Sequence, residues 1–180
     1  MINAQAASLP ASSEVLAPLR RRLGPHMPAQ LFALGNLDIL QLPKTALFCS
    51  GRCPGKLILR TYDQAAQWRD AGHCVVSGFH APVEKECLRI LLRGEPPIII
   101  CPARGLPKRI PPDWKKPLAD GRLLILSIFP NTKSRITADL AARRNELVAA
   151  LADDVFVAHA TPGGRLQTSL RQMQLLRVAT

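Results

Sequence analysis

Five short, almost wholly apolar runs alternate with helical segments, and this alternation constrains the fold more than any other feature of the chain. The runs cover residues 45–49, 73–78, 97–101, 122–127 and 154–160. Apolar periodicity and helix stop residues mark helices at 56–72, 82–94 and 136–152 and a last helix from about Arg165. Strands without polar alternation are buried on both faces, which is typical of parallel sheets. The sequence therefore predicts a three-layer, Rossmann-like α/β fold, with a mainly parallel sheet and helices on both faces.

The domain organisation follows from where this alternation begins. We expect residues 1–40 to form an N-terminal extension, with residues 1–12 unstructured and a short helix within 14–24, and residues 41–180 to form the Rossmann-like domain. The proline-rich, basic stretch 102–117 reads as a long loop. No apolar run approaches the roughly 18 residues of a membrane span. The first residues lack the pattern of a signal peptide, so we expect a cytoplasmic protein with no membrane partner.

The charge of the chain is strongly positive and uneven. The formal net charge is +11, and ten lysines and arginines stand against three aspartates between Arg104 and Arg144. Excess positive charge indicates a phosphate-bearing partner such as a nucleic acid, or simply a solubilising surface. Composition alone leaves both interpretations open.

The cysteines give little support to a metal or disulfide site. Their odd number, five, in a chain without a recognisable secretion signal favours reduced thiols. Cys49 and Cys53 lie four residues apart, but the other candidate pair, His73 and Cys74, consists of adjacent residues that do not readily chelate one ion. We therefore expect no metal and no cofactor.

The ends of the predicted strands carry the residues best suited to bind a ligand. In open parallel sheets, ligands bind beyond the carboxyl ends of the strands. Ser50-Gly51-Arg52 resembles a phosphate-binding turn, but Ser50 and Leu57 stand where a nucleotide-hydrolysing P-loop needs glycine and a hydroxyl. The dinucleotide fingerprint also fails here. We expect the small residues and the following helix start to face an anion without nucleotide hydrolysis.

Four stretches carry a family resemblance: LGNLDILQLPKTALFCSGR, GHCVVSGFHAPVEKECLRILL, AARRNELVAALADDVFVAHA and GGRLQTS. In order and spacing they resemble the DNA-processing protein A family (DprA/Smf) over roughly residues 31–169. The resemblance implies a Rossmann-like domain that binds single-stranded DNA, forms dimers and helps to load a RecA-type recombinase during DNA recombination and natural transformation. The family's arginine is kept at Arg52, and its Arg-Asn pair at Arg144 and Asn145. The family's aspartate is replaced by Glu84.

These observations together predict a DprA-like, basic, single-stranded DNA-binding protein in DNA processing, recombination or uptake, with no catalytic residues. RNA or a free nucleotide as ligand remains open. The predicted phosphate-binding residues are Ser50, Gly51, Arg52, Lys56, Ser77, Gly78, Phe79, His80, Arg104, Lys108, Arg109, Arg143, Arg144, Asn145, Gly163 and Gly164.

Two alternatives remain: a nucleotide-sensing module, and an enzyme like the related phosphoribohydrolases. The enzyme would need a glutamate after the turn Pro162-Gly163-Gly164, and the sequence has none there. Glu84 is the one acid near a strand end, and we expect it to be an exposed acid in the first turn of a helix. For Phe79, a stacking contact with a base competes with simple packing in the core.

Overall fold

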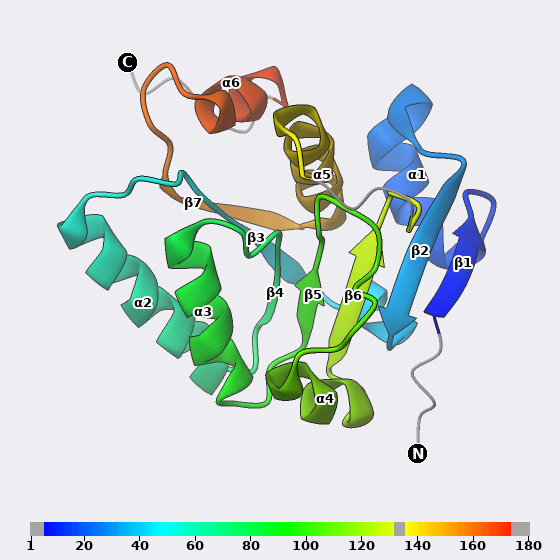
Figure 1. Ribbon diagram of the computed structural model, residues 1–180, viewed down its shortest axis with the longest axis horizontal. Coiled ribbons are helices and arrows are strands. Elements are labelled where there is room, and N and C mark those ends of the chain that lie inside the picture. The colour runs from blue at the N-terminus through cyan, green and yellow to red at the C-terminus, as the bar shows by residue number, and fades with distance from the viewer. Residues whose placement is uncertain (1–5, 132–135, 174–180) are drawn as a thin grey trace.

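The predicted apolar runs form the centre of one seven-stranded sheet in the computed structural model, which describes residues 6–131 and 136–173 (Figure 1). The strands are β1 (Ala6–Pro10), β2 (Gln30–Gly35), β3 (Lys44–Cys49), β4 (Cys74–Ser77), β5 (Ile98–Ile100), β6 (Leu123–Ser127) and β7 (Asp154–His159). Their order across the sheet is β1-β2-β6-β5-β4-β3-β7. The strands from β3 to β7 pair in parallel, whereas β1 and β2 pair antiparallel. The predicted fold class is confirmed.

Helices cover both faces of this sheet. The α-helices are α1 (Ala17–Leu23), α2 (Gly55–Asp70), α3 (Pro82–Leu92), α4 (Pro112–Ala119), α5 (Ala138–Leu151) and α6 (Arg165–Gln172), and short 3-10 helices are η1 (Glu14–Leu16), η2 (Gly24–His26) and η3 (Leu37–Gln41). In Figure 1, α2, α3 and α4 lie on one side of the sheet and α1, α5 and α6 on the other. None of the helices described here is long and apolar enough to cross a membrane.

Alternate residues of the central strands supply the two cores. Leu47 of β3 packs in the core beneath α2 and α3, while its neighbours Ala46 and Phe48 pack in the core beneath α1 and α5. Successive side chains of a strand point to opposite faces, so a strand between two helical layers is apolar at every position. This is why the continuous apolar runs of the sequence identify the inner strands.

The N-terminal segment belongs to the same sheet. The expectation that residues 1–12 are unstructured is wrong for 6–10, which form β1, and the apolar piece after Pro28 contains β2. Because β2 pairs with β6, no break in the sheet separates residues 1–40 from the rest. β1 was not predicted because most of its residues are small and exposed, as befits an edge strand.

The predicted loop 102–117 also contains structure, because its last residues belong to α4. Pro112 occupies the first turn of this helix, where no backbone N–H is needed, and Pro117 lies inside it with a buried ring. The several prolines made this segment look irregular. Figure 1 shows that α4 lies beside the start of β6, so the chain after β5 returns to the amino end of the sheet.

Candidate nucleic-acid interface

A cleft of about 810 Å³ opens beyond the carboxyl ends of β3 and β7. At this point the strand order reverses, because β4, β5 and β6 lie to one side of β3 and β7 lies to the other. Such a topological switch point leaves a crevice between the connections that leave the two strands on opposite faces. The cleft is lined by Cys49, Ser50, Gly51, His80, Ala81, Pro82, Glu84, Ala138, Asp139, Ala141, Ala142, Arg144, Asn145, Thr161, Gly163, Gly164, Arg165, Leu166, Thr168, Ser169 and Gln172.

Three helices begin at this cleft. Pro82 starts α3, Ala138 starts α5 and Arg165 starts α6, and all three residues line the cavity. The unpaired N–H groups at a helix start carry partial positive charge. The cleft is therefore electropositive before any side-chain charge is considered.

Glu84 lies at the base of the cleft and is buried, with 5% of its surface exposed. Its carboxylate accepts hydrogen bonds from the backbone N–H groups of Cys49 (2.9 Å), His80 (2.8 Å) and Ala81 (3.1 Å). Burial raises the pKa of this carboxyl group, while the Arg144 charge and the three N–H donors lower it. The expectation of an exposed acid is wrong, because the first turn of α3 places Glu84 against the sheet, where its carboxylate accepts these three hydrogen bonds.

Arg144 is buried as well, with 6% exposed, although the sequence predicts it as a phosphate contact. Its Nε donates to Asn145 Oδ1 (2.8 Å) and its Nη1 to the carbonyl oxygen of Cys101 (3.3 Å). The guanidinium fills the space beside Gly78, where a Cβ would stand 1.5 Å from Nη1. Burial lowers the pKa of Arg144, and the Glu84 charge raises it.

Four backbone donors of the strand-end turns, those of Ser50, Thr161, Gly163 and Gly164, are engaged within the protein. Ser50 N–H donates to the carbonyl oxygen of His159 (2.8 Å), and Thr161 N–H to Ser50 Oγ (2.9 Å). Gly163 N–H donates to Gln167 Oε1 and Gly164 N–H to the Thr161 carbonyl oxygen, both at 2.9 Å. These groups do not point freely at a ligand, which leaves side-chain cations as the main donors to an anion.

The structure brings some of the predicted site residues together in the cleft: Ser50, Gly51, His80, Arg144, Asn145, Gly163 and Gly164. Beneath it lie Ser77, Gly78 and Phe79. The Ser77 hydroxyl accepts the Phe79 N–H (3.1 Å), and Phe79, at φ 45°, is only 5% exposed within the core. The Phe79 ring therefore offers no open face for stacking on a base.

The other predicted cations are exposed around the cleft without lining it. Arg52 and Lys56 lie on the turn after β3 and the first turn of α2, and Arg104 follows β5. Arg143 lies on α5, with its guanidinium 5.6 Å from the centre of the Phe129 ring. Lys108 and Arg109 are also exposed, further along the segment that returns to α4.

The pKa of His80 shows that several of these positive charges lie near one another. Partial burial lowers the pKa of His80, and the positive charges of Arg144, Lys85 and Arg104 lower it further. Cations from α3, α5 and the segment after β5 thus act on one side chain at the cleft. Within residues 6–131 and 136–173, no three His, Cys, Asp or Glu side chains gather as metal ligands would.

Sequence reasoning missed part of this site. It did not select Arg165, Thr168 or Gln172 of α6 as site residues, although all three line the cleft. The available signal was Arg165 itself, a basic residue directly after the glycine turn and at the start of a helix. Only the packing of α6 against α5 brings that helix over the end of β3.

The fold and the cleft define a Rossmann-like α/β protein with an open cleft at a topological switch point of its sheet. More specifically, residues 10–177 match the family model of DNA recombination-mediator protein A, and the chain belongs to that family. No curated protein matches the chain.

Two solved structures share the fold. DNA processing protein A from Streptococcus pneumoniae has a TM-score of 0.75 and 21% identity, over 94% of this chain and 60% of that one. DNA processing protein A from Helicobacter pylori, a structure described as giving insight into the single-stranded DNA binding mode of that protein, has a TM-score of 0.72 and 21% identity. That match covers 98% of this chain and 84% of the other. This chain thus spans less than two thirds of the pneumococcal protein.

Proposed function

We propose that this chain binds single-stranded DNA by its phosphates across the carboxyl edge of the sheet, and that it does so without catalysis. One observation carries the proposal. A set of exposed cations surrounds the cleft, and within the part of the chain that the structure describes none of them forms an ion pair. These edge cations are Arg52, Lys56, Arg104, Arg143 and Arg165.

The edge cations come from four separate segments that the fold gathers at one edge. Unpaired cations on several elements suit a ligand with several regularly spaced negative charges, as a nucleic-acid backbone has. Phosphate contacts dominate such affinity, so binding should depend weakly on base sequence. Membership of the DNA recombination-mediator family supports this reading. Lys108 and Arg109 extend the same positive surface toward α4.

The absence of catalysis is part of the proposal and rests on Glu84. A phosphoribohydrolase-like reaction needs a carboxylate that is free to act at a sugar. Glu84 instead holds three backbone N–H groups and is buried, which fits a structural role. By analogy with its family, we further propose that the protein acts in the cytoplasm, forms a homodimer and assists a RecA-type recombinase.

The volume of the cleft supports a second candidate function, the sensing of a nucleotide. A volume of about 810 Å³ lies within the usual range of small-ligand pockets, roughly 300–1,000 Å³. A single nucleotide could therefore occupy the cleft as a sensed ligand. A competition experiment separates the two functions. If micromolar AMP displaces a fluorescent DNA strand from the protein, the nucleotide sensor is favoured, and if it does not, binding of single-stranded DNA is favoured.

The direct test is a titration of fluorescent single-stranded DNA at two salt concentrations, with Arg52→Ala beside the parent. Log affinity should fall with log salt by roughly 0.7 per phosphate contact. Arg52→Ala should weaken binding by about 1–3 kcal/mol, because it removes a charged hydrogen bond, and should reduce the slope by roughly one contact.

Arg89→Ala is the matched control, since Arg89 is an exposed arginine that pairs with Glu86 on α3 and does not line the cleft. It should bind like the parent. The proposed function fails if folded Arg52→Ala and Arg89→Ala bind equally tightly at low salt.

A further inference from the structure

The Glu84 carboxylate occupies a place that strand ends normally offer to a ligand anion. Its three N–H donors come from two segments, the end of β3 (Cys49) and the connection from β4 to α3 (His80 and Ala81). Oriented backbone N–H groups at strand ends and helix starts are typical anion-binding elements. Here a side chain of the protein itself fills that position.

The hydrogen-bond donors around Glu84 favour its carboxylate form, although burial raises the pKa of this group above its ordinary value. Each of its three hydrogen-bond partners is a donor, so a carboxylate satisfies them all, and the opposite charge is supplied by Arg144. Arg144 is held in turn by Cys101 and Asn145, in the space that the missing Cβ of Gly78 leaves open. A buried charge requires such compensation.

We propose that Glu84 is the resident anion of this strand-end site, and that it directs a DNA phosphate outward to the edge cations. The second clause rests on the proposed function, whereas the first does not depend on DNA. Glu84 is in these terms a positioning residue, because it fixes the ends of β3 and β4 without touching the strand.

Removal of the carboxylate then creates a specific vacancy. In Glu84→Ala, three N–H groups lose their acceptor and Arg144 loses a nearby negative charge, and the cleft leads directly to the vacated place because Glu84 lines it. A small carboxylate from solution fits the same donors. A ligand that binds only the folded state raises its stability by mass action.

The experiment compares melting temperatures in sodium acetate and in sodium chloride at equal ionic strength. Acetate should raise the melting temperature of Glu84→Ala by roughly 2–4 °C, on the usual relation between a small gain in unfolding free energy and the melting temperature of a chain of this size. The melting temperature of the parent should not change. Glu86→Ala, which loses a partly exposed acid two residues further along the same helix, should behave like the parent. Equal shifts in all three proteins would overturn the proposal.

A second pair of variants keeps the test decisive if Glu84→Ala does not fold. Glu84→Asp keeps the charge and shortens the chain, whereas Glu84→Gln keeps the length and turns an amide N–H toward N–H donors. The aspartate variant should melt higher, and the opposite order would contradict a resident anion. A parent that fails to bind DNA sinks the proposed function but leaves these melting results standing, so the two failures are distinguishable.

Discussion

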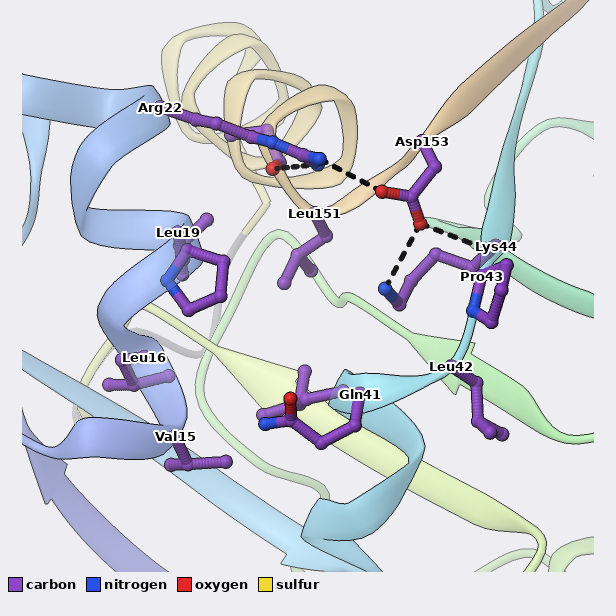
Figure 2. A pocket seen from close by; sticks show the side chains of 13 residues that line it. Val15, Leu16, Leu19, Arg22, Gln41, Leu42, Pro43, Lys44, Leu151 and Asp153 are labelled. Carbon is purple, nitrogen blue, oxygen red and sulfur yellow. Dashed lines mark hydrogen bonds and ion pairs between the residues drawn. The ribbon is translucent and has the colours of Figure 1, made fainter.

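Charged side chains pair with one another at the amino ends of the strands, whereas most of the cations near the carboxyl ends are exposed and have no ion pair among the described residues. At the amino ends of β3 and β7, a pocket of about 220 Å³ lies between α1, η3 and the end of α5 (Figure 2). Its charges bind one another: Arg22 donates to Asp153 Oδ1 (2.8 Å) and Asp153 Oδ2 accepts from the Lys44 backbone N–H (3.1 Å) and Nζ (3.5 Å). At the carboxyl ends, the innermost charges, Glu84 and Arg144, are not paired with each other but are each held by hydrogen bonds to other groups of the protein.

This difference separates structural charges from charges available to a ligand. Arg22 also donates to the carbonyl oxygens of Ala150 (3.1 Å) and Ala152 (2.6 Å), where the end of α5 carries partial negative charge. The guanidinium is thereby committed to joining α1 to α5. Among the described residues the edge cations form no such ion pairs or hydrogen bonds, so arginine stabilises the fold at one end and, under the proposed function, serves recognition at the other.

The largest effect should come from Gly78→Ala, which displaces the buried Arg144 side chain near the carboxyl ends of the strands. The new Cβ would stand 1.5 Å from Arg144 Nη1, so the guanidinium must leave its place and Glu84 loses its compensating charge. We expect a loss of about 1.5–3 kcal/mol in the free energy of unfolding, because the buried guanidinium loses its hydrogen bonds to Asn145 and Cys101. Urea denaturation measures it.

Gly51→Ala is the control for this substitution, because a Cβ at Gly51 meets nothing within 4 Å. It should change stability by no more than about 0.5 kcal/mol. Equal stability of the two alanine variants would show that Arg144 is not confined as described.

Arg22→Ala should lower the free energy of unfolding by less than Gly78→Ala, and it should show that charges at the amino ends act on stability and not on DNA binding. It removes the link between α1, α5 and Asp153, and we expect a loss of about 1–2 kcal/mol because the side chain is partly exposed. Binding of single-stranded DNA should not change. Arg21→Ala, an exposed neighbour on α1, should leave both stability and binding unchanged. Weaker DNA binding by folded Arg22→Ala alone would contradict the division of roles.

The stability difference between the parent and Arg22→Ala should depend on pH. The hydrogen bond from Arg22 is the main cause that lowers the pKa of Asp153 below its ordinary value of 3.8. A lowered folded-state pKa contributes stability above the ordinary pKa, and this contribution is lost as the pH falls through the folded value. The stability gap between the parent and Arg22→Ala should therefore narrow below about pH 4. A gap of constant size in acid would argue against this ion pair.

The smallest expected effect concerns His80. Its pKa is lowered by burial and by Arg144, Lys85 and Arg104, so it becomes protonated only below its ordinary value of 6.5. The added charge should strengthen DNA binding as the pH falls, by up to about fivefold, which corresponds to one exposed charge contact of at most about 1 kcal/mol. His80→Gln should abolish this rise in fluorescence titrations, and His26→Gln, away from the cleft, should keep it.

Much of the fold was predictable because its determinants are local. The apolar runs around Leu47 and Ile99 identify strands buried on both faces, and glycine stops such as Gly94 end the helices between them. α4 and β1 were missed because prolines and small exposed residues carry weak local signals. The location of the cleft was also predictable, since parallel strands bring their carboxyl ends to one edge of the sheet.

Patterns of a few adjacent residues were thus enough to predict the layers, the central strands and the edge of the sheet at which the cleft lies. Which charges at that edge are free follows from the packing of the folded chain. Glu84 and Arg144 lie 60 positions apart, and no local pattern reveals that one caps three N–H groups while the other occupies the space beside Gly78. Burial and compensation of a charge depend on packing between distant segments, and that packing exists only in the folded chain.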